Sequence, residues 1–450
     1  MYEAESGQTS IALAGDVLLT RPLSVFREES YLRLRQLLHA ADARFCNLEA
    51  SVHRYLDGQH AQRQGGGTYM TTEPGLLDDL KWLGINMLAC GSSHADDYGW
   101  TGVMETLDYL DRAGIVHAGS GRHLAEARAP SFLDTPRGRI ALHAANGQFN
   151  PGARAGEQRR DTLGHPGVNG VRHYECYDID RALMDDLRRV GQAIGLGAAE
   201  ERGANQGEPG QERGEGRYDF LGTRFAIGDQ PAIHSYAHQS DIRENMRQIG
   251  AARAMADRVI ASLHNHDQGG PTYLAAGKRS EVEYPADYAI DYAHSAIEAG
   301  ADVFVGHGPQ VPLAVEVYKG RPVFHGMGAF IFTIETLRYL PEEAYERYGL
   351  DERATPADFV LTRYANDTRG HTAHREQWEQ LFAVCDFAGD ALKEIRLHPI
   401  ELGFGKPRSQ RGRPVLAEAE AAERIISRVA RLSSKYGTHV DLKDGIGVIR

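Results

Sequence analysis

Cysteine is scarce in this sequence. Only four of the 450 residues are cysteines, Cys46, Cys90, Cys176 and Cys385, and no two of them form a CxxC pair. This scarcity excludes a disulfide framework and a zinc ribbon. Because isolated thiols persist in reducing compartments, we expect free cysteines and a cytoplasmic protein.

Long hydrophobic runs and an excess of positive charge are also lacking. No segment approaches the ~18 apolar residues that span a bilayer, and the polar N-terminus lacks a basic secretory region. The sequence therefore predicts no membrane partner. Fifty Lys and Arg against 62 Asp and Glu give a net charge of −12, which argues against a nucleic-acid partner. The acidic balance favours a cationic or metal-bridged ligand and leaves the oligomeric state open.

What the sequence contains is an alternation of short apolar runs with segments of helical period, and this order predicts a mostly parallel sheet covered by helices. We expect one layered α/β domain over residues 1–400, with an exposed loop at about 195–217, and a C-terminal helix and tail over 401–450 that pack on it. The expected strands are Ser10–Leu19, Ala43–Leu48, Met87–Cys90, Ile140–Ala145, Arg258–Leu263, Val303–Gly306, Pro322–Gly326, Phe382–Phe387 and Leu392–Pro399. The expected helices are Tyr31–Ala41, Pro74–Leu83, Gly102–Ala113, Asp180–Ile194, Asp241–Arg253, Ala286–Ala299 and Ala417–Leu432.

Acidic and imidazole side chains follow five of these strands. In parallel sheets the strand ends meet at one edge, where ligands bind. Carboxylate oxygens beside imidazole nitrogens are typical ligands of a divalent cation, and such an ion can activate water. Each strand end alone is a weak signal, but five in order form a strong one. The strand-end groups are Gly15-Asp16, Asn47-Leu48-Glu49, the run from Cys90 to Asp97, His264-Asn265-His266-Asp267, and the run from Gly306 to Gln310.

The ordered set resembles the bacterial capsule-synthesis CapA family, also called the poly-γ-glutamate capsule family, of the calcineurin-like metallophosphatase superfamily. Further phrases support it over nearly the whole chain, including GDVLL at 15–19, NLEASV at 47–52, HADDYG at 94–99, GVNGVR at 167–172 and LSSKYGTHV at 432–440. The resemblance implies a metallophosphatase-like layered α/β sandwich. It also implies a divalent metal, one or two ions of Mn, Zn, Ca or Mg.

The resemblance also implies roles for particular residues. Asp16, Glu49, His94, His264 and His307 are the implied metal ligands, and His266 or His307 would move a proton in catalysis. Ser93, Gln310 and Arg172 are candidates to bind substrate. Each has an ordinary structural alternative, such as a turn-capping carboxylate, a buried core imidazole or, for Arg172, a solvated loop side chain.

Departures from the superfamily pattern bear on the reaction. Leu18 stands where phosphatases have a histidine, Ser93 replaces an asparagine, and the last motif ends in Gln310 instead of histidine. These changes remove ligands for metal and phosphate. We therefore expect a metal-dependent hydrolase that acts on an amide or peptide bond, perhaps γ-glutamyl, through activated water or a polarised carbonyl. The alternatives are a phosphoesterase, a peptide epimerase and a non-catalytic protein of capsule biosynthesis.

Overall fold

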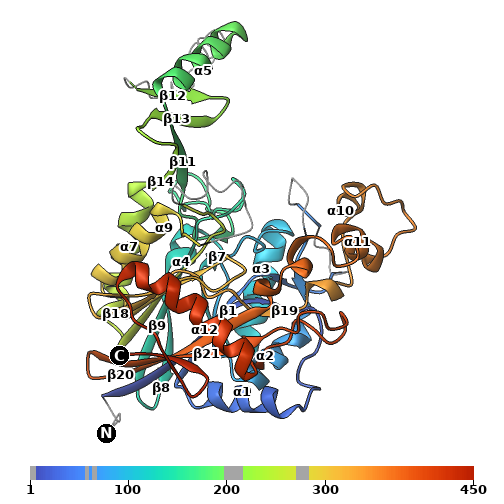
Figure 1. Cartoon of the computed structure of the whole chain (residues 1–450), viewed down its shortest axis with the longest axis vertical. Helices are drawn as coiled ribbons and strands as arrows, with labels where there is room; N and C mark the ends of the chain where they lie inside the picture. Colours follow the sequence, from blue (N-terminus) through green and yellow to red (C-terminus); the bar gives the residue numbers. More distant parts are fainter. Residues whose placement is uncertain (1–6, 56–59, 63–67, 197–215, 270–282) are drawn as a thin grey trace.

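The structure, a computed structural model, describes residues 7–55, 60–62, 68–196, 216–269 and 283–450. The expected loop at 195–217 lies almost entirely outside these residues. Elsewhere, the strands and helices expected from the sequence are present, with bounds that differ by a few residues. Figure 1 shows a layered body from which a smaller unit projects.

Two large sheets form the centre of the described chain. The first has the order β23-β24-β21-β20-β1-β2-β5-β6, with β19 beside β1 and β22 beside β21. Its β1, β2, β5, β6 and β19 run parallel, whereas β20–β24 add antiparallel pairs. Its strands are β1 (Gln8–Leu18), β2 (Ala43–Leu48), β5 (Met87–Ala89), β6 (Val116–Ala118), β19 (Ala329–Phe332), β20 (Glu379–Ala388), β21 (Ala391–Glu401), β22 (Val415–Leu416), β23 (Asp441–Lys443) and β24 (Ile446–Ile449).

The second sheet has the order β17-β18-β16-β15-β9-β8. Strands β9, β15, β16 and β18 run parallel, and the edge strands β8 and β17 are antiparallel. The strands are β8 (Ser131–Thr135), β9 (Gly138–Asn146), β15 (Arg258–His264), β16 (Val303–His307), β17 (Val315–Tyr318) and β18 (Arg321–Phe324). The expected α/β sandwich with mostly parallel central sheets is therefore confirmed, with antiparallel strands added at the edges.

The sheets face each other across one apolar core, to which Leu13 and Phe45 contribute from the first sheet and Leu142 and Val305 from the second. Helices cover the outer faces and give four layers. The first sheet carries α1 (Glu29–His39), α2 (Leu77–Leu83) and α3 (Gly99–Ala113), and the second carries α7 (Gln239–Arg253) and α9 (Asp287–Glu298). The shorter elements around them are η1 (Pro74–Leu76), α4 (Leu124–Arg128), the strand pair β3 (Ser51–Val52) and β4 (Thr71–Thr72), and the pair β7 (Ser120–Gly121) and β10 (Gly167–Val168).

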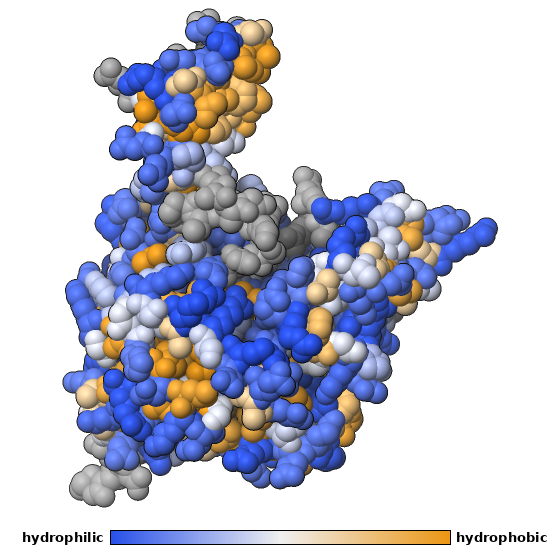
Figure 2. Space-filling model, viewed as in Figure 1, coloured by the Kyte–Doolittle hydropathy of each residue, from blue (hydrophilic) through white to orange (hydrophobic). Residues whose placement is uncertain are grey.

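A four-stranded unit projects from the body beyond α7 and α9 (Figure 1). The sequence patterns indicated its helix but not its strands, which are short and only half-buried. Apolar side chains gather on the surface of this unit (Figure 2), among them the exposed Leu183, Val190, Ile194 and Leu221. The unit consists of β11 (His173–Ile179), α5 (Arg181–Ala193), β12 (Arg217–Phe220), β13 (Thr223–Ile227) and β14 (Ala232–Ala237).

Two further segments complete the described chain. Helix α12 (Ala419–Ser433) packs against the antiparallel part of the first sheet through Ile425, Ile426 and Val429, and is followed by η5 (Ser434–Tyr436). The excursion between β19 and β20 consists of short helices: η2 (Ile334–Thr336), α10 (Glu342–Glu346), α11 (Pro356–Arg363), η3 (Gly370–Ala373) and η4 (Arg375–Gln377).

Candidate metal centre

A β-bulge sets the position of Asp16. The pairing of β1 with β2 shifts register between Leu13 and Asp16, so that Asp16 lies opposite Asn47. Glycine is needed at position 15, because a Cβ there would overlap the carbonyl oxygen of Gly328. The same oxygen accepts a hydrogen bond from the Asp16 backbone N–H. Bulges reorient side chains in this way next to functional sites. The bulge therefore turns the Asp16 carboxylate inward, where it is almost fully buried.

The second sheet brings two histidines to the same place. His264 ends β15, His307 ends β16, and the two residues are direct partners in the parallel register. The next residue, Gly308, has φ +106°, and its N–H donates to Asp16 Oδ2 at 3.0 Å. A side chain at this position would overlap the backbone of Asn265, so only glycine allows the close approach.

Asp16 is surrounded by nitrogen atoms. Its Oδ1 accepts a hydrogen bond from Asn47 Nδ2 at 2.7 Å and lies 3.4 Å from His307 Nδ1 and 3.8 Å from His264 Nδ1. Burial alone would raise the pKa of this carboxyl group, but the contacts with His264 and His307 outweigh burial and hold the pKa well below its usual range. The Asp16 side chain is therefore a carboxylate.

Glu49 forms the other half of the group. Its Oε1 lies 3.8 Å from His264 Nε2 and 3.4 Å from His266 Nε2, and it accepts a hydrogen bond from Ser93 Oγ at 3.2 Å. Burial and the charge of Asp16 would raise the pKa of Glu49, but His266 and His264 lower it below its ordinary value. Conversely, burial would lower the pKa of His266, but the Glu49 carboxylate outweighs burial and raises it.

Ligand atoms of Glu49, His264 and His266 lie within 4.8 Å of one another, close enough for one cation to contact all three. Several buried polar atoms of the group have no hydrogen-bond partner among the described residues: His264 Nε2, both ring nitrogens of His307, and Asn47 Oδ1. Orphaned atoms of this kind carry a desolvation penalty that a bound ion would remove. The mixture of imidazole nitrogens and carboxylate oxygens fits a divalent cation.

Two positions from the sequence analysis lie at the edge of this group. His94 Nδ1 is 2.6 Å from Asp97 Oδ2, and His94 is not a member of the three-residue cluster. Its neighbour Ser93 contacts both Glu49 and His266.

Leu18, which stands where phosphatases have a histidine, is buried in the apolar core between the first sheet and its helices. That position therefore supplies packing in this chain.

Gln310 and Arg172 lie in different surroundings. Gln310 lines a cavity beside the carboxylates, and its carbonyl oxygen accepts a hydrogen bond from Gln380. Arg172 forms the bidentate contact that its side chain favours, but with the protein's own Asp241, at 2.8 and 3.0 Å. Arg128 and Arg154 contact the same carboxylate. Arg172 is outside the cavity lining, so no substrate role follows from its position.

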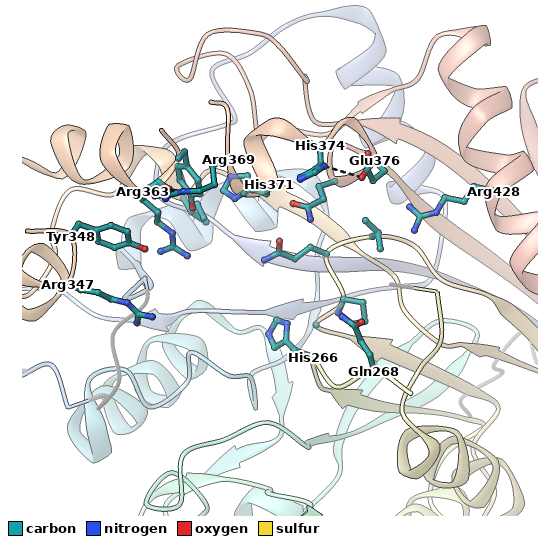
Figure 3. Close-up of a pocket in the computed structure, with 18 residues that line it drawn as sticks. His266, Gln268, Arg347, Tyr348, Arg363, Arg369, His371, His374, Glu376 and Arg428 are labelled. Atoms are coloured by element: carbon teal, nitrogen blue, oxygen red, sulfur yellow. Dashed lines mark hydrogen bonds and ion pairs between the residues drawn. The ribbon is translucent and has the colours of Figure 1, made fainter. Parts of the chain in front are cut away.

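The cavity has a volume of about 820 Å³ and opens next to His266 and Gly308. In Figure 3, His266 and Gln268 lie on one side of it, while Arg347, Tyr348, Arg363 and Arg369 come from the excursion between β19 and β20, and Arg428 comes from α12. The chain is acidic overall, but four arginines and one carboxylate, Glu376, line this cavity. The acidic balance of the whole sequence suggested a cationic or metal-bridged ligand, whereas this lining favours an anionic one.

Sequence reasoning missed two parts of the site. Asn47 contacts Asp16 and His264 Nδ1, and its place in the same strand-end group as Glu49 was the available signal. Three of the cavity arginines lie in or beside the short helices of the excursion, Arg428 lies in α12, and none of the four directly follows a strand. No motif marked them.

Comparisons with known proteins give one family match and several relatives of this chain. The family model described as bacterial capsule synthesis protein PGA_cap matches residues 10–334. An uncharacterized protein of Sinorhizobium fredii is 31% identical over 457 residues, which cover 99% of this chain and 93% of its own. The PGA biosynthesis protein CapA of Bacillus subtilis is 42% identical over 72% of this chain and 63% of its own.

A probable polyglutamine synthesis accessory protein of Mycobacterium tuberculosis is 24% identical over 89% of this chain and 75% of its own.

Across the described residues, no helix has both the length and the apolar character that crossing a membrane requires.

Proposed function

The chain belongs to the PGA_cap family of bacterial capsule synthesis proteins, whose fold is metallophosphatase-like, and from this premise we propose that it is a metal-dependent hydrolase of a γ-glutamyl amide bond. The observation that carries the proposal is the convergence of Asp16, Glu49 and His264 from separate strands. Beside them, His264 Nε2 and both ring nitrogens of His307 are buried and have no hydrogen-bond partner in the described part of the chain. The name of the Bacillus relative, a PGA biosynthesis protein, supports a glutamyl polymer as the substrate class, and the Mycobacterium relative is named for the synthesis of polyglutamine.

Glu49 and His264 of the three-residue cluster would hold the ion, and Asp16 and His307 lie on the Nδ1 side of the same His264 ring. A divalent cation, when bound, would supply a polarised carbonyl and a water of lowered pKa. We propose one ion of zinc or manganese, because imidazole nitrogens suit these metals better than calcium or magnesium. Asn47 and the Gly308 N–H orient the Asp16 carboxylate by hydrogen bonds at 2.7 and 3.0 Å.

His266 is the residue that we assign to proton transfer. It lines the cavity and its side chain is 30% exposed, whereas His264 and His307 are almost fully buried. Its Nε2 lies 3.4 Å from Glu49 and 3.3 Å from Ser93 Oγ, and these contacts fix the ring at the cavity wall. A base at this position reaches a substrate in the cavity and can pass a proton to the leaving amine.

Two observations support an amide over a phosphoester. Leu18 is part of the core, so the histidine that phosphatases place there has no counterpart at the site. Ser93 stands where an asparagine would contact metal and phosphate, and its hydroxyl is engaged with Glu49. Both features remove ligands for a phosphoryl group, whereas an amide needs only a polarised carbonyl, water and a base.

The test is turnover of three chromogenic substrates by the purified, metal-analysed protein: γ-glutamyl-p-nitroanilide, α-glutamyl-p-nitroanilide and p-nitrophenyl phosphate. We expect about one equivalent of metal and release of nitroaniline from the γ-linked compound, abolished in Asp16→Asn. Glu352→Gln alters an exposed carboxylate outside the cavity lining and is the matched control for Glu49→Gln. Faster hydrolysis of the phosphate would favour a phosphoesterase. Absence of metal and turnover would favour a non-catalytic role.

We also propose a cytoplasmic location. All four cysteines are free and buried, which suits a reducing compartment. Cell fractionation of the native host, with the protein found in the envelope fraction, would contradict this assignment.

A further inference from the structure

The cavity beside His266 has a basic wall that the reaction described above does not use. We call Arg347, Arg363 and Arg369 the arginine wall. Arg347 follows α10, Arg363 ends α11 and Arg369 precedes η3, and all three line the cavity. Figure 3 shows the wall opposite His266 and Gln268, with Arg428 further along the cavity. With the histidines neutral, four arginines and Glu376 give the lining three net positive charges.

Two of these guanidinium groups have uncharged partners. Arg363 donates to the Thr68 hydroxyl, and Arg369 donates to the backbone carbonyls of Thr362 and Arg363. Arg411, which is outside the cavity lining, instead forms a bidentate contact with Glu335 and a further one with Asp367 at 2.9 Å. Two carboxylates of the excursion therefore neutralise Arg411, which comes from the segment between β21 and β22, whereas Arg363 and Arg369 have no carboxylate partner within the described residues.

The buried His371 lines the same cavity as the arginine wall. Burial, followed by the positive charges of Arg363 and Arg411, lowers the pKa of His371 to about 3. His371 is thus neutral, and the positive potential at this end of the cavity comes from arginine. Because clefts with low-dielectric walls concentrate such a field, an anionic ligand is drawn there.

The arrangement suits several anionic groups better than one. A single phosphate would be bound by guanidinium groups that converge on one point, whereas these arginines come from separate elements and line different parts of the cavity (Figure 3). The volume of about 820 Å³ is near the top of the roughly 300–1,000 Å³ range of ligand pockets. A γ-linked glutamyl chain carries one free α-carboxylate per residue, and each can form a bidentate contact with arginine.

We propose that the arginine wall binds successive α-carboxylates of a γ-linked glutamyl chain and so directs one of its amide bonds to His266. The identity of the linkage rests on the proposed function. The wall then determines specificity by requiring a polyanionic chain. Its contribution is electrostatic and is weakened by salt.

The test is fluorescence anisotropy with a fluorescein-labelled γ-linked pentaglutamate. We expect Arg347→Gln/Arg363→Gln to raise the Kd at least ~10-fold and Arg347→Lys/Arg363→Lys to restore part of the affinity. The matched control, Arg33→Gln/Arg243→Gln, removes the same charge from exposed helix positions outside the cavity and should bind as the wild type does. If the glutamine pair unfolds on thermal denaturation, the lysine pair with a salt titration provides the comparison.

Three results would overturn the proposal: unchanged affinity in the glutamine pair, equal binding of an α-linked pentaglutamate, or tighter binding of a short polyphosphate. The binding assay is independent of turnover. Loss of chain binding in the arginine variants, together with no anilide turnover by the wild type, would remove the proposed hydrolase but keep the arginine wall. Turnover by the wild type with unchanged binding in the variants would support the hydrolase and remove the arginine wall.

Discussion

The two sides of the cavity are built differently. On one side, Asp16, Glu49, His264 and His307 sit at strand ends, almost fully buried, and are fixed by bulge, register and glycine contacts. On the other side, the arginine wall lies on short helices and its side chains are partly or largely exposed. Rigid strand ends suit groups that need sub-ångström placement, whereas long charged side chains on short helices suit binding of a flexible polyanion. Chemistry and specificity are thus assigned to different parts of the fold.

The largest expected effect comes from His264, whose two ring nitrogens face Asp16 and Glu49. We expect His264→Ala to lose the metal and to reduce turnover by more than the ~10–100-fold typical of outer-shell changes. Metal analysis and kinetics on γ-glutamyl-p-nitroanilide measure both quantities. His439→Ala, at an exposed position near the C-terminus, is the control. Full metal content in His264→Ala would contradict the assignment of His264 as a ligand.

The excursion that carries the arginine wall depends on one buried ion pair. Arg411 and Glu335 are 4% and 3% exposed, and Arg411 also lies 5.0 Å from the centre of the Trp378 ring. Glu335→Gln would leave the guanidinium with only Asp367, so we expect the free energy of unfolding to fall by about 3 kcal/mol. Chemical denaturation gives this value.

The same variant separates the two sides of the cavity. Because the ion pairs of Glu335 are with Arg408 and Arg411 and not with the proposed metal ligands, Glu335→Gln should keep its metal while its affinity for the glutamyl chain falls. A parallel loss of metal would show that the two sides are coupled.

The sequence predicts the strand-end side of the cavity better than the arginine wall, and the reason is physical. Strand-end residues such as Asp16 and His264 are predictable because parallel strands deliver their ends to one edge, whatever the loops do. Asn47 was not predicted as a site residue because an amide between strands is usually structural. Arg363 was not predicted because its position depends on the packing of Phe359 and Val360 into the core next to the first sheet. This long-range contact has no local sequence pattern.

Net charge was also a poor guide, since the arginines gather locally in an acidic chain. The expected division at residue 400 and the remaining substrate roles stay predictions.

Buried neutral histidines behind each side make stability depend on pH. Burial lowers the pKa of His143, in β9, to about 4 and that of His371, near the arginine wall, to about 3. Below about pH 6.5 the unfolded chain binds protons that these folded-state rings do not, so folding loses stability as the pH falls from 6.5 towards 4. We expect each ring to account for about 2 kcal/mol between pH 7 and pH 5.

Chemical denaturation of the wild type and of His371→Phe, at pH 7 and at pH 5, measures the loss of unfolding free energy on acidification. His371→Phe should show a smaller loss of stability on acidification than the wild type. Equal losses in the two proteins would mean that the ring is protonated in the folded state.

The smallest expected effect is at Gln310, which lies where the two sides meet. Its side chain lines the cavity, while its backbone carbonyl is held by Gln380 Nε2 at 2.8 Å. In Gln310→Ala the backbone contact remains and only a neutral hydrogen bond to substrate is lost, worth about 1 kcal/mol. We therefore expect KM for the glutamyl chain to rise a few-fold with kcat unchanged, measured by steady-state kinetics. A fall in kcat with constant KM would instead place Gln310 at the reacting amide, on the side of the strand ends.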